Sequence, residues 1–317
     1  MTDKQINKWL RRRFSVVGWV LLLYYGLMTF TTALTAVTDL ASQFIASFPA
    51  NPANSVDWSA VNGNAWGYIA AILVSFAVLD AWKGSRFRKQ EILVREAPMR
   101  AGTFLSLLCF CMGAQMINSL WITLLERILS LFGKSVMPIL ESVAGDSDTF
   151  SMFLYASVLG PIWEEFLFRG YVLRSLRPYG KRFSILASAI LFGLFHGNLL
   201  QTPYALLMGL VLGYVTVEYS IIWAVLLHMF NNLVLADLLT RLTAYWSDTA
   251  IGLLNLMLFG GSAVISAIIL LKNRQSIKEY RESEWIDRRC LKCFATSGGV
   301  LLLAGWMCIS MFLIFLP

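Results

Sequence analysis

Charged residues are scarce in this chain. Only 14% of the 317 residues are Asp, Glu, Lys or Arg, whereas 57% are hydrophobic, and the mean hydropathy is +0.64. A soluble domain usually has about 25% charged residues. Apolar runs of roughly 20 residues recur along the chain, and this is the length that crosses a bilayer as a helix. The composition argues against a soluble domain and predicts a membrane protein with several spans.

Cysteine is also sparse, and several common catalytic strings are missing. The five cysteines do not form the paired pattern of a disulfide framework. Cys290 and Cys293 form a single CxxC that lacks the second half of a zinc site, so we expect reduced, structural cysteines. No GxSxG, HExxH, GxGxxG or P-loop string occurs to indicate the chemistries that those motifs carry.

The apolar segments predict an all-α fold, a polytopic bundle of about nine transmembrane helices. With a cytoplasmic N-terminus, 23 of the 26 Lys and Arg residues fall in inner segments, as in membrane proteins generally. This asymmetry predicts an outer C-terminus and an odd number of spans. The spans are expected near residues 14–38, 65–82, 103–125, 150–168, 184–200, 204–217, 221–239, 250–271 and 294–316.

Two adjacent carboxylates interrupt the fourth apolar segment, in the string WEEFLFRG. An ionisable group inside a span costs roughly 2.5–3.5 kcal/mol, so such groups are functional candidates. Glu165 and Arg169 lie four residues apart and share a helix face, where the guanidinium can neutralise the carboxylate. Glu164 points about 100° away and stays free for other partners.

The chain has only two histidines, and both fall in predicted spans. His228 shares a helix face with Asn232, and Asn231 at the third position is an alternative. Helix rise places Glu164, His196 and these groups at similar depths, so we expect them to converge in the inner half of the bilayer.

These groups suit peptide-bond hydrolysis without a covalent intermediate. A carboxylate and an imidazole can hold and deprotonate water, and a second imidazole and an amide can donate to an oxyanion. A zinc protease with His196, His228 and a Glu as ligands is one alternative. A non-enzymatic scaffold or a proton-coupled transporter is another, because intramembrane Glu and His also serve in proton transfer.

Three short motifs occur in order on separate spans: EEFLFR matches EExxxR, FGLFH matches FxxxH, and HMFNN matches HxxxN. In these motifs the chain resembles the CPBP family of intramembrane proteases, named for CAAX proteases and bacteriocin-processing enzymes and also called the Abi family. The resemblance covers roughly residues 150–240. It implies a metal-independent, glutamate-type endopeptidase without a cofactor.

Carried over by position, the resemblance implies that Glu164 activates water with help from His196. It implies an oxyanion hole formed by His228 and Asn232. The remaining motif positions take a supporting, electrostatic role and are Glu165 and Arg169.

The resemblance also divides the chain. We expect a two-span membrane region at 1–102, a protease core at 103–240, and a two-span region with a cytosolic linker at 241–317. The expected partners are a peptide or protein substrate, with or without a lipid modification, and the lipid bilayer, but no nucleic acid. The expected location is a bacterial plasma membrane.

Overall fold

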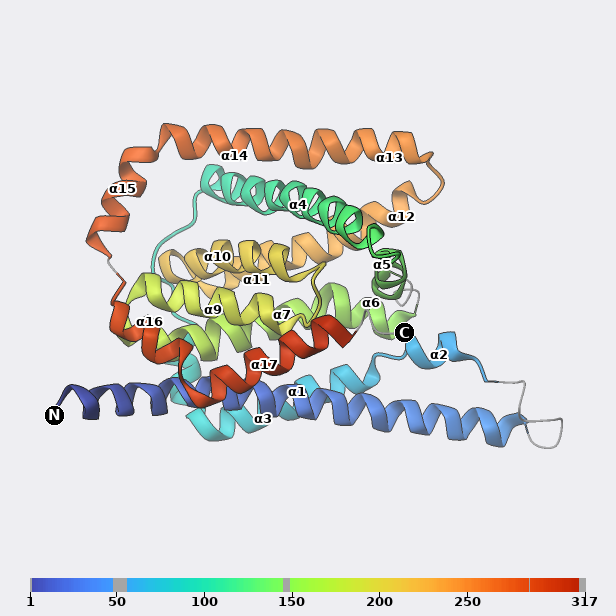
Figure 1. Cartoon of the computed structure of the whole chain (residues 1–317), viewed down its shortest axis with the longest axis horizontal. Coiled ribbons are helices and arrows are strands. Elements are labelled where there is room, and N and C mark those ends of the chain that lie inside the picture. Colours follow the sequence, from blue (N-terminus) through green and yellow to red (C-terminus); the bar gives the residue numbers. More distant parts are fainter. Residues whose placement is uncertain (1, 48–55, 145–148, 285, 314–317) are drawn as a thin grey trace.

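The computed structural model of the chain is a bundle of helices. It describes residues 2–47, 56–144, 149–284 and 286–313. Within these residues no β-strand forms, and a single isolated bridge joins Arg95 to Ser220. The predicted all-α class is therefore confirmed (Figure 1).

The helices follow one another with short connections, and the elements labelled η are π-helical turns except η5, which is a 3₁₀ turn. The first part of the chain forms α1 (Asp3–Ser47), α2 (Trp58–Asn62), α3 (Trp66–Phe87), η2 (Arg88–Ile92), α4 (Ala101–Ser130) and α5 (Met137–Ala144). The central part forms α6 (Phe150–Leu154), η3 (Tyr155–Leu159), α7 (Gly160–Glu164), η4 (Glu165–Leu173), α8 (Arg174–Leu176), η5 (Arg177–Tyr179), α9 (Lys181–Phe195), α10 (Thr202–Glu218), α11 (Ile221–Met229) and η6 (Phe230–Leu238). The last part forms α12 (Leu239–Thr243), α13 (Asp248–Asn255), η7 (Leu256–Gly260), α14 (Gly261–Lys272), α15 (Arg274–Ser283), α16 (Arg288–Ala295) and α17 (Gly298–Leu313).

The number of membrane-crossing helices is lower than the predicted nine by a criterion of length and apolarity. Four helical stretches of the described residues meet it, and two bent pairs of helices raise the number to six. Among the central helices, Ile221–Thr243 meets the criterion, whereas α9 and α10 are too short. For example, α9 has 15 residues and spans roughly 22 Å, less than the ~30 Å hydrocarbon core. Each of the nine predicted segments lies wholly or mostly in helix, but a count of nine spans is not confirmed.

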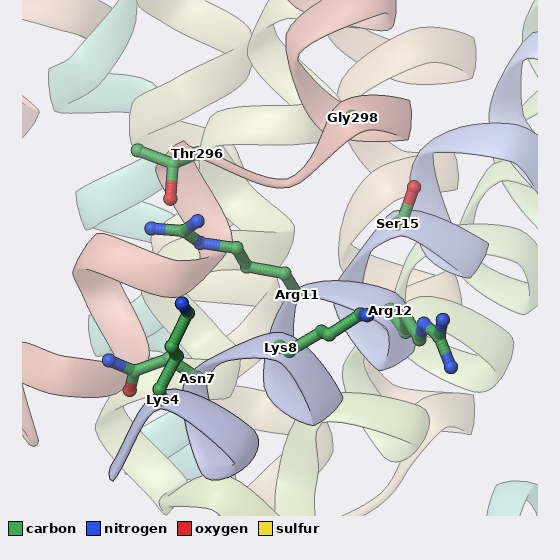
Figure 2. Close-up of a pocket in the computed structure, with 8 residues that line it drawn as sticks. All are labelled: Lys4, Asn7, Lys8, Arg11, Arg12, Ser15, Thr296 and Gly298. Carbon is green, nitrogen blue, oxygen red and sulfur yellow. The ribbon is translucent and has the colours of Figure 1, made fainter.

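The two ends of the bundle differ in charge. At one end, contacts join the start of α1, the start of α9 and the linker helices: Asp3 pairs with Arg289 at 2.7 Å, and Arg182 donates to the Arg281 carbonyl at 3.0 Å. We call this the basic end and the opposite one the neutral end. Figure 1 shows the N-terminus, α15 and α16 at the basic end and α2, α5 and α12 toward the neutral end. Figure 2 shows the cationic rim of the basic end beside α16 and α17, lined by Lys4, Asn7, Lys8, Arg11, Arg12, Ser15, Thr296 and Gly298.

The first and last long helices cross closely at small residues. The Gly299 amide donates to the Ser15 hydroxyl at 2.7 Å, and a Cβ at Gly299 would lie 2.1 Å from the Ser15 carbonyl oxygen. Inside this layer, aromatic residues of α1, η4 and α9 form the main core, including the fully buried Phe14, Phe168 and Phe183. Small residues at a crossing let backbones approach, which is how helices pack in lipid. The helices α1 and α17 therefore pack closely together beside the central helices.

Candidate active site

The helix that carries the two glutamates is irregular along its length. It runs from Phe150 to Leu176 without a break, but it contains the π-helical turns η3 and η4. Pro161 lies inside it and lacks the N–H that a regular helix requires. Widened turns of this kind are frequent at functional sites, because they change the direction in which the following side chains point.

Glu165 lies in the centre of the bundle with no exposed surface. Its Oε1 atom is 3.0 Å from Nη1 of Arg169, which is also fully buried, and 2.9 Å from Nδ1 of His228. The Arg169 guanidinium also stacks over the Phe192 ring at 4.2 Å. A buried carboxylate is tolerated only when its charge is compensated in this way. The expected pairing of Glu165 with Arg169 is seen, and the contact with His228 is an additional finding.

His228 stands between the two carboxylates. Its Nδ1 atom must donate to Glu165, because a carboxylate oxygen only accepts. Its Nε2 atom faces Glu164, with 3.8 Å between Nε2 and Oε2. This gap is too long for a direct hydrogen bond. Glu164 is one quarter exposed, at 27% of its side chain, so the second carboxylate borders open space while the first does not.

His196 is the C-cap residue of α9, and its ring is also bound to the protein through Nδ1. Its Nδ1 atom lies 2.9 Å from the Phe192 carbonyl oxygen. A carbonyl oxygen only accepts, so Nδ1 carries the proton and the Nε2 atom of the neutral ring keeps its lone pair. Gly197 stops the helix directly after it with a φ of +62°, which glycine adopts without strain. The two imidazoles are separated by Phe192, which packs edge-on against both rings.

The two asparagines follow His228 in the π-helical turn η6. Asn232 donates from Nδ2 to the Ala156 carbonyl at 3.0 Å, and Asn231 donates to Oδ1 of Asn232 at 3.0 Å. Tyr204 of α10 donates its hydroxyl to Oδ1 of Asn231. One proton of the Asn232 amide remains for another acceptor. Both asparagines therefore border the same space, and Asn231 holds Asn232 in place.

A cavity of about 440 Å³ connects these groups. Its lining includes all four candidate catalytic residues, whereas Glu165 and Arg169 do not line it. The lining is buried at Phe192, Ala205 and Met208 and exposed at Ala236 and Thr240, twelve residues beyond His228 along the helix. The cavity therefore opens toward the neutral end of the bundle.

Other polar residues that the sequence patterns did not predict as site residues also line this cavity. They are Gln115, Asn118, Gln201 and Tyr204. The first two lie within an apolar segment, where polar side chains are uncommon, and that rarity was the signal that could have found them. Tyr204 gives no comparable signal, because tyrosine is also frequent at membrane interfaces.

Comparison with known proteins places this site in a family. Residues 146–234 match the family model described as type II CAAX prenyl endopeptidase Rce1-like. The matched residues, 89 of 317, make up less than a third of the chain, and this central part is similar to that protease family. The match contains all three motifs, and the predicted resemblance is therefore confirmed at the level of the family. No curated protein and no solved structure matches the chain.

The match to an endopeptidase family supports a peptidase, and the apolar helices indicate a membrane protein. The zinc alternative requires three ligands that converge on one point. Among the residues that the structure describes, no three His, Cys, Asp or Glu side chains do so.

Proposed function

We propose that the protein is a glutamate-type intramembrane endopeptidase that hydrolyses a peptide bond with a water molecule held at Glu164. The observation that supports it most is the different partners of the two imidazoles around one cavity, because Nδ1 binds a backbone carbonyl in His196 and a carboxylate in His228. His196 offers a lone pair at Nε2, whereas His228 lies between two carboxylates with Nε2 directed toward Glu164. One ring is thereby suited to accept a proton and the other to donate a hydrogen bond.

In the proposed reaction the water oxygen attacks the carbonyl carbon of the scissile bond. Glu164, assisted by His196, takes one proton from the water. The negative charge that develops on the carbonyl oxygen accepts hydrogen bonds from Nε2–H of a doubly protonated His228 and from the free amide proton of Asn232. Collapse of the tetrahedral intermediate breaks the C–N bond, and the proton on Glu164 passes to the leaving amine. The products are a carboxylic acid and an amine, with no covalent enzyme intermediate.

Glu165 and Arg169 support this reaction without touching the substrate. Glu165 accepts a hydrogen bond from Nδ1 of His228 and so orients the ring, while Arg169 balances the charge of Glu165. The pair is fully buried behind the cavity, so its geometry is fixed by the surrounding helices. This arrangement keeps the donor at Nε2 aimed at one place before the substrate arrives.

The substrate in this proposal is a peptide or membrane-associated protein that reaches the site from the neutral end. The exposed rim of the cavity lies there, opposite the basic loops that mark the cytoplasmic side. A bacterial plasma membrane fits the short connections between spans. Whether the substrate carries a lipid is decided by offering matched lipidated and unmodified peptides.

The test is cleavage by the purified protein in lipid nanodiscs, with a peptide library read by mass spectrometry. Wild type should cleave a subset of peptides, and Glu164→Gln should lose that cleavage because a neutral isostere cannot accept the proton. Glu282→Gln, an exposed surface change, is the matched control and should keep full activity. Wild-type turnover should survive dialysis against a strong chelator. Equal cleavage by Glu164→Gln, or activity that is lost with chelator and regained with zinc, would overturn the proposal.

A further inference from the structure

An apolar groove lies on the membrane-facing side of α1 and α3, away from the candidate active site. It has a volume of about 430 Å³. Its walls include Trp19, Leu23 and Val74, whose exposed fractions are 53%, 64% and 45%. The full lining is Val16, Trp19, Val20, Leu23, Tyr24, Leu27, Val74, Ser75, Val78 and Leu79.

The groove continues into a polar chamber at the basic end. This chamber has a volume of about 380 Å³ and lies between α1, α3 and the end of η4. Val16 and Val20 line both spaces, so the two are neighbours along α1. The chamber is lined by Arg13, Lys83 and Arg174, against one carboxylate, Glu91. Its charge is therefore positive.

Buried polar atoms border this chamber without a partner. The Tyr171 side chain is 3% exposed, and its hydroxyl has no hydrogen-bond partner among the described residues. The Nε atom of the buried Arg174 is likewise unpaired, although its Nη1 atom binds Glu96 at 3.0 Å. Buried polar groups are almost always satisfied, so an unpaired hydroxyl and guanidinium nitrogen beside one chamber indicate an occupant with acceptor atoms.

The electrostatics of the chamber favour an anion. Lys83 donates to the Ser175 hydroxyl at 3.4 Å and lies just inside the basic end. Burial lowers the pKa of Lys83, and the neighbouring charge of Arg13 lowers it further. Two cations that repel each other in this way are stabilised by a negative group placed between them.

The dimensions fit one leaflet of a bilayer. From Val16 to Leu27, the part of α1 that lines the groove, the helix rises by roughly 16 Å. Half of the hydrocarbon core is about 15 Å thick, so a chain lying in the groove starts at the inner interface and ends near the midplane.

From the groove, the chamber and the unpaired polar atoms, we infer a binding site for an inner-leaflet glycerophospholipid with a net negative headgroup. The phosphate occupies the chamber beside Arg13, Lys83 and the Tyr171 hydroxyl, and one acyl chain lies in the groove between α1 and α3. The cationic rim of Figure 2 differs, because Lys8 and Arg12 border an open hollow that the apolar groove does not adjoin. We expect that rim to attract anionic lipids only through its net positive charge, as basic loops at a membrane surface do.

The rim supplies a charge-matched control for the test. The double variant Arg13→Gln/Lys83→Gln and the control Lys8→Gln/Arg12→Gln each remove two positive charges. Full-length protein is purified from vesicles of phosphatidylglycerol and phosphatidylcholine, and retained lipid is counted by native mass spectrometry. Wild type and the control should retain one phosphatidylglycerol. The Arg13/Lys83 variant should retain about tenfold less, because it loses charge-assisted hydrogen bonds.

A second pair of variants tests the groove itself and does not depend on charge. Val20→Trp fills the junction of groove and chamber, whereas Val37→Trp, on the exposed outer part of α1, adds the same bulk elsewhere. Val20→Trp should abolish retention and Val37→Trp should not. Soluble glycerol phosphate should not raise the melting temperature, whereas phosphatidylglycerol should. Equal retention by the two charge variants, equal retention by the two Trp variants, or stabilisation by glycerol phosphate alone would each overturn the lipid site.

Discussion

The central helices and the flanking helices of this bundle differ in how deeply they are buried and in how regular they are. In the central part, Glu165 and Arg169 are fully buried, and the helix that carries them contains widened turns. In the flanking helix α1, which is apolar enough to span a membrane and contains no widened turn, only 11% of the most apolar window is buried within the protein. A regular apolar helix satisfies its own backbone and needs only lipid around it. The central helices contain widened turns instead, and these turns direct polar side chains toward one another.

Two ion pairs with the same spacing, one buried and one exposed, show the same contrast between the central and the flanking region. Glu165 and Arg169 are four residues apart in the interior, and Lys278 and Glu282 are four residues apart on the surface of the linker helix α15. The first pair has no exposed surface, whereas the side chains of the second are about two-thirds exposed. Spacing alone makes the two pairs look equivalent, but their surroundings give them different strengths.

The largest expected effect comes from breaking the buried pair. Glu165→Gln leaves the Arg169 charge uncompensated in a low-dielectric interior, which costs about 3–5 kcal/mol. Activity should also fall, because His228 loses the carboxylate that orients it. Glu282→Gln, in the exposed pair, should change stability by less than about 1 kcal/mol. Thermal unfolding of both variants in the same detergent provides the measurement, and similar losses would remove the distinction between the two regions.

A slightly smaller effect is expected at the oxyanion side. Removing one donor typically lowers kcat by about 10²–10³, or roughly 3–4 kcal/mol. Asn232→Ala should therefore reduce kcat while leaving substrate affinity nearly unchanged, because the donor acts on the transition state. Asn231→Ala should cost less, since that side chain binds Tyr204 and Asn232. The measurement is the turnover of both variants on one peptide, together with their affinity for that peptide. If Asn231→Ala is inactive and Asn232→Ala is near wild type, the two roles must be exchanged.

The crossing of α1 and α17 offers a test in the flanking region. Gly299→Ala places a methyl group against the Ser15 backbone, and such overpacking typically costs about 1–3 kcal/mol. Gly305→Ala on the same helix meets no atom within 4 Å and should be neutral. Melting temperatures should separate the two variants, while both should keep wild-type kcat at a temperature where they are folded. Loss of kcat in folded Gly299→Ala would show that the flanking helices take part in positioning the site.

The smallest expected effect is a change in the reactivity of Cys290. Burial, and then the charge of Asp287, raises the pKa of this thiol to about 11. Because the thiolate is the reactive form, alkylation should be slow at neutral pH and should accelerate only above about pH 10. Asp287→Asn keeps an oxygen acceptor for the Arg289 amide but removes the charge, so the profile should move to lower pH. The measurement is alkylation rate against pH in a variant whose only cysteine is Cys290, and a neutral-pH midpoint would contradict it.

Sequence spacing was enough to find the residues around the cavity but not to assign their partners. The four-residue spacing placed Arg169 beside Glu165, and the structure shows that contact. The bond from His228 to Glu165 crosses between helices, and its geometry depends on how η4 and α11 pack, which no local pattern reports. The widened turns were also missed, because a regular turn was assumed throughout. Pro161 was the only local sign of irregularity.

The count of nine spans is not confirmed, for a related reason. Hydropathy reports which segments avoid water, and the segments near 150–168 and 184–200 avoid it by packing against other helices as well as against lipid. Several of their side chains are fully buried in the protein, as Leu167, Ala189 and Leu191 show. A helix surrounded by protein does not need the length or regularity of one surrounded by lipid.

The most direct test of the account is the source of oxygen in the first product molecule. With enzyme in excess over peptide, a single turnover in ¹⁸O-labelled water distinguishes attack by water from attack by the Glu164 carboxylate. Direct attack by water places ¹⁸O in the new carboxyl group of the first product. An acyl intermediate on Glu164 that water opens at the glutamyl carbon would instead deliver unlabelled oxygen from the protein and leave the label on Glu164. The account predicts labelled product and unlabelled protein, and the reverse pattern would contradict it.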